Sequence, residues 1–169
     1  MPAVAVAPQI EAVWLGLGEL TVLLSGGWVL FALLSELDWG WLTGRTGVRW
    51  ATVLFGVSLV PIGLSHLMYV KPTYDLVPAW MPLRVIWSYV TGVGQMACGM
   101  GVLLLPTTTG RRAAATVEAV MISLFTVLCW GPAIVMTPKM RLGWTAFWIS
   151  WAIGSAAWVV AEKQTHGRE

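Results

Sequence analysis

The chain carries very little charge for its length. Of its 169 residues, 11% are charged and 57% are hydrophobic, and the formal net charge is +2. A soluble domain carries about 25% charged residues. Because so few charged side chains cannot cover a surface in water, lipid must be the solvent for much of the chain. The small net charge also argues against nucleic-acid binding, and the only adjacent basic residues are Arg111 and Arg112.

Cysteines and ligand-binding motifs are equally scarce. Cys98 and Cys129 both lie in apolar runs, which favours reduced, buried side chains over a disulfide or redox pair. Zinc and iron–sulfur ligand spacings are missing, as are the common hydrolase, metalloprotease and P-loop motifs. His66 lies in an apolar run but His166 lies in the polar tail, so the histidine pair of a membrane haem is lacking. These absences predict no metal site and no catalytic residues, and they favour a non-catalytic protein. A single intramembrane histidine could still bind the magnesium of a pigment.

Long apolar runs dominate what is present. A helix that spans a bilayer needs roughly 20 mostly apolar residues. The runs that meet this requirement are about 11–34, 50–70, 85–105, 113–136 and 143–161, and segments rich in Gly, Pro and charged residues separate them. The first run is too long for a cleaved signal peptide and contains Glu19, so we interpret it as a retained helix. The sequence therefore predicts an all-α fold, with residues 1–169 forming one bundle of about five transmembrane helices.

Basic residues are distributed unequally between the two ends of these predicted helices. Lys71, Arg84, Lys139 and Arg141 fall on the side of the N-terminus. The other side carries Arg45, Arg49, Arg111, Arg112, Lys163 and Arg168. Since cytoplasmic loops are enriched in Lys and Arg, this bias predicts an N-terminus outside and a C-terminus in the cytoplasm. The predicted location is the bacterial inner membrane.

The predicted fifth helix has two different faces. Trp144, Trp148, Trp151 and Trp158 recur at helical spacing along one face. The small residues Gly143, Ala146, Ser150, Gly154, Ala157 and Ala161 form a second stripe, nearly opposite. Small residues let helices approach closely, so this stripe is predicted to pack into the bundle and the Trp face to point outward. The Trp face either contacts lipid or provides a contact surface for another membrane subunit or a flat hydrophobic cofactor.

Polar residues at membrane depth are the candidates for a functional site, because they are costly there. Glu19, His66 and Gln95 are all predicted in the outer half of the bundle, where they could form one polar pocket with Arg84 above it. Glu19 and His66 either exchange protons with a quinol-like ligand or serve as hydrogen-bonded contacts between helices. We expect Glu118, which lies near the start of the fourth run, to extend toward the adjacent arginines at the membrane surface.

The segment from Val60 to Leu105 resembles the DoxX-like family of small bacterial membrane proteins. The matching residues are Gly63 and His66, the loop from Val77 to Pro82, Thr91-Gly92, Gln95 and Gly99. The resemblance implies a bundle of four core helices, to which the first helix here is an addition. It also implies a link to quinone-dependent or thiol redox systems, although Gln95 stands where the family frequently has an acid. That replacement argues against proton transfer at this position.

Two functions follow as the main hypotheses. The first is a non-catalytic accessory subunit of a respiratory or photosynthetic membrane complex, packed against lipid, pigment or partner subunits through the Trp face. The second is a quinone-linked redox protein with a polar pocket around Glu19, His66 and Gln95. A small carrier or channel is the least favoured, because the chain is short for a transporter built from two repeats.

Overall fold

The computed structural model describes residues 10–163, and all regular secondary structure within this range is helical. The five long segments are α2 (Glu11–Leu34), α3 (Gly44–Met68), α5 (Arg84–Leu104), α6 (Thr108–Phe125) and α8 (Arg141–Lys163). Shorter elements connect them, namely η1 (Gly40–Leu42), α4 (Val70–Leu76), the π-helical η2 (Thr126–Trp130) and α7 (Gly131–Met136). The predicted all-α bundle is therefore confirmed. Residues 1–9 and Arg168, which entered the orientation argument, lie outside the described residues.

The apolar composition of these helices agrees with transmembrane segments. Within residues 10–163, four helical stretches are long and apolar enough to cross a membrane: α2, α3, the continuous stretch Thr108–Met136, and α8. The remaining long helix, α5, has 21 residues but is less apolar, because Ser, Thr, Gln and several Gly residues interrupt its sequence. Many large apolar side chains in the described residues face outward, which suits contact with lipid.

Three segments differ from the sequence-based expectation. The second long helix begins at Gly44 rather than near 50. Residues 71–76, expected in a loop, belong to the short helix α4, because a proline at the third position is compatible with a first helical turn. The fourth long helix begins at Thr108 rather than near 113. Thr107 caps it by accepting a hydrogen bond from the Gly110 amide at 3.1 Å, so the two adjacent arginines lie inside the helix.

Glycines set the close contact between α3 and α5. A Cβ atom added to Gly63 would lie 2.5 Å from the Gly92 carbonyl oxygen, and one added to Gly92 would lie 2.8 Å from the Gly63 oxygen. About two helical turns further along, Gly56 and Gly99 meet in the same way: a Cβ atom added to either would lie 3.1 or 2.6 Å from the other's carbonyl oxygen, respectively. The two helices run in opposite directions with backbones in direct contact, the arrangement that small residues allow in membranes.

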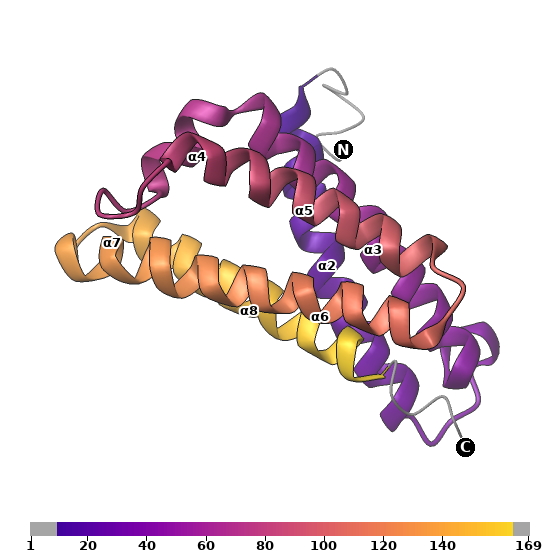
Figure 1. The fold of residues 1–169 in the computed structure, drawn as a ribbon. Coiled ribbons are helices and arrows are strands. Elements are labelled where there is room, and N and C mark those ends of the chain that lie inside the picture. Colours follow the sequence, from indigo (N-terminus) through magenta and orange to yellow (C-terminus); the bar gives the residue numbers. More distant parts are fainter. Residues whose placement is uncertain (1–9, 164–169) are drawn as a thin grey trace.

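The long helices pack as two groups that diverge toward one end. Figure 1 shows α3 beside α5 and α6 beside α8, and the two pairs separate toward the end that carries α4 and α7. Helix α2 contacts both α3 and α8, with Gly26 against Ala156 at the second contact. The apolar core lies where the groups meet and includes Val22, Phe55, Val102, Ala119 and Ala157. The divergence of the two groups leaves room for a cavity at the α4 end.

A π-helical segment interrupts the fourth long helix at that end. Pro132 lacks the amide that would bond one turn back, and its ring clashes with the carbonyl four residues earlier. The preceding residues Thr126–Trp130 widen into a π-helix, a feature that often occurs at functional sites. This local widening places Phe125 and Trp130 against the cavity.

Candidate binding site within the helix bundle

A cavity of about 520 Å³ lies between the diverging helix groups. Its wall takes residues from every long helix, and most of the wall is apolar, including Leu15, Ile62, Met121 and Phe125. A volume in this range suits a small ligand, and a mostly apolar wall with a few polar groups is typical of ligand sites. The cavity lies at the N-terminal end of α2 and the C-terminal end of α3, which is a single end of the bundle.

The structure brings three of the predicted site residues together in this wall. Glu19 from α2, His66 from α3 and Gln95 from α5 all line the cavity. Glu19 and His66 are half-buried and Gln95 is 2% exposed. The structure therefore places these three residues in the wall of one cavity.

Most of the hydroxyl groups in the cavity lining donate hydrogen bonds to carbonyls of their own helices. Ser65 donates to the Ile62 carbonyl at 2.7 Å, Thr91 to the Trp87 carbonyl at 2.8 Å, and Thr73 to the Tyr69 carbonyl at 2.9 Å. These oxygens keep lone pairs and can only accept further hydrogen bonds. His66 Nδ1 lies 3.4 Å from the Thr73 hydroxyl, so the matching tautomer carries its proton on Nδ1 and leaves Nε2 as an acceptor.

Gln95 connects the cavity wall to a deeper carboxyl group. Its Nε2 atom donates to Glu118 Oε1 at 3.4 Å. Among the described residues, Gln95 Oε1 and Glu118 Oε2 have no hydrogen-bond partner. The amide nitrogen faces Glu118, and the unpaired amide oxygen is fully buried behind the cavity wall.

Glu118 does not extend to the membrane surface as the sequence suggested. It is 0% exposed and lies in the bundle interior, on the face of α6 that also buries Ala115, Ala119 and Ile122. The expectation was wrong because α6 starts earlier than its apolar run, which puts Glu118 about three turns inside the helix. Arg111 instead donates to the Leu105 carbonyl at 2.6 Å, and Arg112 lies 4.0 Å from Glu162.

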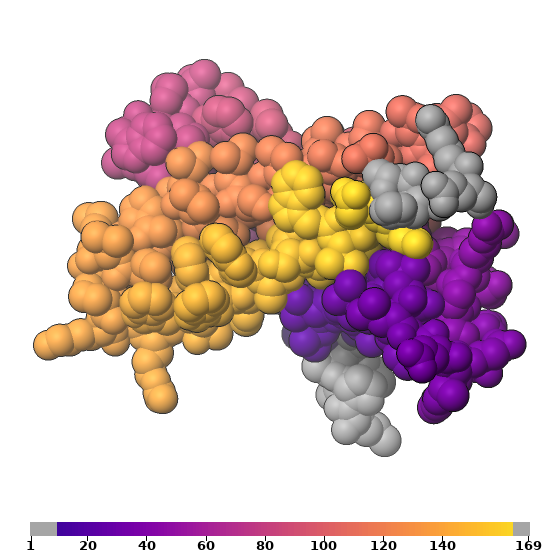
Figure 2. Space-filling model, turned by 90° about the horizontal axis from the view of Figure 1, so that it is seen from below, coloured from indigo at the N-terminus to yellow at the C-terminus, as the bar shows by residue number. Residues whose placement is uncertain are grey.

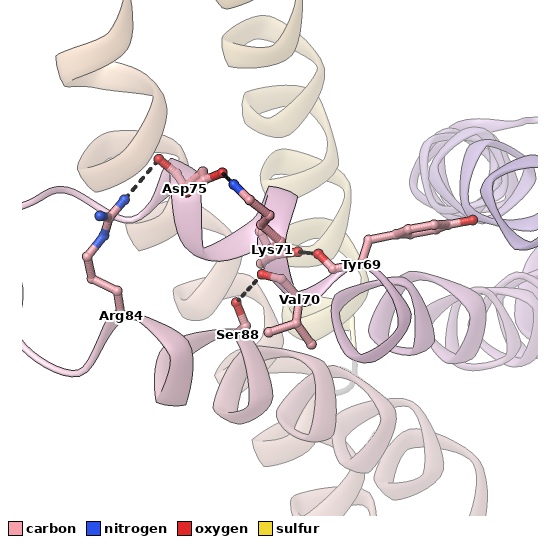
Figure 3. A network of polar contacts seen from close by, with 7 residues as sticks. Tyr69, Val70, Lys71, Asp75, Arg84 and Ser88 are labelled. Atoms are coloured by element: carbon pink, nitrogen blue, oxygen red, sulfur yellow. Dashed lines mark hydrogen bonds and ion pairs between the residues drawn. The ribbon is translucent and has the colours of Figure 1, made fainter.

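Arg84 lies outside the cavity wall and holds the loop that precedes α5. Its Nε donates to the Val77 carbonyl at 2.7 Å and its Nη2 to the Asp75 carbonyl at 3.1 Å, as Figure 3 shows for the Asp75 contact. These bonds brace Leu83, whose φ of 57° is rare for a residue other than glycine. Nearby, the hydrogen bond from Lys71 to Asp75 raises the pKa of Lys71.

The predicted Trp face is exposed along α8. The exposed fractions of Trp144, Trp148, Trp151 and Trp158 are 40%, 58%, 51% and 44%. Figure 2 shows a face of the molecule along which the orange and yellow segment containing α8 extends. Trp158 is tied to the bundle, because its indole nitrogen donates to the Ser123 hydroxyl at 3.2 Å.

The small stripe of α8 has two environments. Gly143, Gly154, Ala157 and Ala161 are buried, as predicted for a packing face. Ala146 and Ser150 instead line the cavity, because α8 has diverged from α2 and α3 at that end. The stripe therefore contributes both to helix packing and to the wall of the candidate site.

Sequence reasoning missed several residues of these features. Phe147 stacks on Trp151 at 5.9 Å between ring centroids and contacts Trp148 edge-on at 5.3 Å, which joins the exposed indoles into one aromatic surface. Phe147 follows Trp144 by three residues, and this helical spacing could have placed it on the Trp face. The sequence has no such spacing for two other residues of the cavity wall. Tyr69 is positioned by the end of α3, and Trp130 by the π-helical segment.

The fold and the cavity define a small helical membrane protein with a largely apolar cavity between its helices that carries a few polar groups. Residues 55–154 match the model of a family described as a domain of unknown function, DUF8561. Because the match covers more than half of the chain, the protein belongs to this family. Neither the curated proteins nor the solved structures contain a significant match.

Proposed function

We propose that the protein binds a lipid-soluble ligand of the quinone class in the cavity between its helices. The observation that carries the proposal is the convergence of Glu19, His66 and Gln95 on one largely apolar cavity of about 520 Å³. A quinone ring has a flat apolar body and two opposed oxygens, so it matches an apolar wall with a few polar groups. In a quinone-linked redox system, the chain would hold this ligand within the membrane.

The balance of donors and acceptors favours the reduced form of the ligand. The ionised carboxyl of Glu19 and Nε2 of His66 can accept hydrogen bonds, and three of the lining hydroxyls already donate to carbonyls of their own helices. A quinol offers hydroxyl donors to such groups, whereas a quinone offers only acceptors. The hydroxyls of Tyr69 and Ser150 and the indole N–H of Trp130 are donors in the cavity lining that a quinone can use, so the preference for the quinol is a partial one.

We expect His66→Leu to weaken quinol binding by about tenfold, which corresponds to the loss of roughly one hydrogen bond of about 1.4 kcal/mol. The measurement is titration of the detergent-purified protein with decyl-benzoquinol and decyl-benzoquinone. Thr21→Val, which removes a hydroxyl of α2 outside the cavity wall, should leave both affinities unchanged. Equal binding by decylbenzene, or full affinity in His66→Leu, would exclude the proposal.

The same proposal accounts for the residues behind the DoxX-like resemblance. Gly63 and Gly92 form the close contact of α3 with α5, and His66 and Gln95 lie on the same two helices against the cavity. We also propose that the chain is related to the DoxX-like family. We further propose that it lies in a bacterial cytoplasmic membrane with its N-terminus outside, and this orientation rests on the distribution of Lys and Arg.

A second candidate function is an accessory subunit of a respiratory or photosynthetic complex. The observation that favours it is the exposed aromatic surface of α8, since Trp is enriched at interfaces. We expect the double variant Trp148→Ala, Trp151→Ala to lose co-purification with subunits of such a complex in mild detergent. Trp80→Ala serves as the control, because it removes an exposed Trp that does not belong to α8. Unchanged association in the double variant would leave the Trp face as a lipid contact.

A further inference from the structure

A second cavity, of about 410 Å³, lies at the opposite end of the bundle. It is formed by the N-terminal part of α3, the C-terminal end of α5, the start of α6 and the end of α8. Its lining includes the basic residues Arg45, Arg49, Arg111 and Lys163. None of the proposed quinone-site residues lies in its wall, so this cavity is a separate feature.

The charge of this cavity has a single sign. Four cationic side chains from three helices line it, and its described lining contains no Asp or Glu. Arg49 lies on α3, Arg111 on α6 and Lys163 on α8, so three helices bring positive charge to one place. Glu162 lies near this end, 4.0 Å from Arg112, and neither of these two residues is in the cavity wall. An anion bound among Arg49, Arg111 and Lys163 would relieve the repulsion among these three cations.

The rest of the wall is suited to the acyl part of a lipid. Val48, Val53, Val102 and Leu103 line the cavity beside the basic residues. Thr108 also lines it, and it stands in the first turn of α6, where the helix dipole favours negative charge. The guanidinium of Arg111 is held in place because its Nε donates to the Leu105 carbonyl. A cationic zone next to an apolar zone matches a phosphate head group joined to hydrocarbon chains.

We propose that this cavity binds the head group of an anionic phospholipid from the leaflet at this end, with its acyl chains along the apolar wall. Basic pockets between transmembrane helices are known to recognise anionic head groups in this way. Arg and Lys side chains would bind the phosphate group of the lipid. The apolar part of the wall would favour a membrane lipid over a soluble phosphate compound. The inference does not depend on the quinone proposal, because the two cavities share no residues.

The test is native mass spectrometry of the purified full-length protein titrated with phosphatidylglycerol and with phosphatidylcholine of the same acyl chains. We expect preferential binding of phosphatidylglycerol, and a loss of about fivefold in its affinity for each cation removed. The double variant Arg49→Gln, Lys163→Gln should therefore bind about 25-fold more weakly. Within residues 10–163 neither the Arg49 nor the Lys163 side chain forms a hydrogen bond or ion pair, so the bundle should stay folded.

Matched controls separate the site from general charge. The double variant Lys139→Gln, Arg141→Gln removes the same charge at the other end and should keep full affinity, as should the charge-preserving Lys163→Arg. Circular dichroism checks that each variant keeps its helicity. Equal binding of phosphatidylcholine, or unchanged affinity in the Arg49 and Lys163 double variant, would overturn the proposal. Equally tight binding of glycerol 3-phosphate would also overturn it, in favour of a soluble phosphate compound.

Discussion

Replacing Gly63 with leucine is expected to prevent α3 and α5 from assembling, and Gly63→Ala is expected to destabilise the protein by about 1–3 kcal/mol. Even the single methyl group of alanine would lie 2.5 Å from the Gly92 carbonyl oxygen, and backbone cannot yield as a flexible side chain can. The two helices would have to separate along their whole contact, including the Gly56 and Gly99 crossing. The thermal midpoint of the detergent-solubilised protein measures the effect.

Gly27 provides a matched control for this substitution. It lies inside α2, and a Cβ atom added there would meet nothing within 4 Å. Gly27→Ala should therefore be neutral or slightly stabilising, since alanine favours a helix more than glycine does. The double variant Gly63→Ala, Gly92→Ala should cost less than the sum of its singles, because either change alone already separates the same contact. Equal effects at Gly63 and Gly27 would show that the close contact of α3 with α5 contributes little.

The sequence predicted the helices closely because hydrophobic length is a strong signal in lipid. The predicted range 11–34 coincides with α2 (Glu11–Leu34), and 85–105 differs from α5 (Arg84–Leu104) by one residue at each end. Helix starts in polar segments were harder to predict. The α6 helix begins before its apolar run, because Thr107 caps a first turn that is too polar to lie in lipid.

The candidate site was only partly predictable. Glu19, His66 and Gln95 stood out because polar residues are rare in apolar runs, and no packing information was needed to select them. The partner of Gln95 could not be found in this way. Which side of α6 faces α5 depends on helix packing, so the burial of Glu118 follows from the tertiary structure and not from its own segment. The divergence of the helix pairs that opens the cavity is likewise a property of the whole bundle.

The contact between Gln95 and Glu118 can decide whether these polar residues bind a ligand or only join helices. We expect Gln95→Leu alone to destabilise the bundle by about 1–3 kcal/mol, because Glu118 then keeps no hydrogen bond to Gln95 while it remains fully buried. The double variant Gln95→Leu, Glu118→Leu should regain most of this stability, since replacing both partners with apolar groups is often nearly neutral. Thermal midpoints of the two singles and the double give the coupling energy.

Ligand affinity measured on the same variants separates the two interpretations. If the pair only joins helices, the double variant should be stable and should bind decyl-benzoquinol as the unmodified protein does. If Gln95 presents its amide oxygen to the ligand and Glu118 sets the orientation of that amide, the double variant should be stable but bind more weakly. Glu118→Gln sharpens the distinction, because the new amide can donate to Gln95 Oε1 and turn the Gln95 nitrogen toward the cavity. This variant should keep its stability and shift its preference from the quinol toward the quinone. An unchanged preference would count against Glu118 as the group that orients the site.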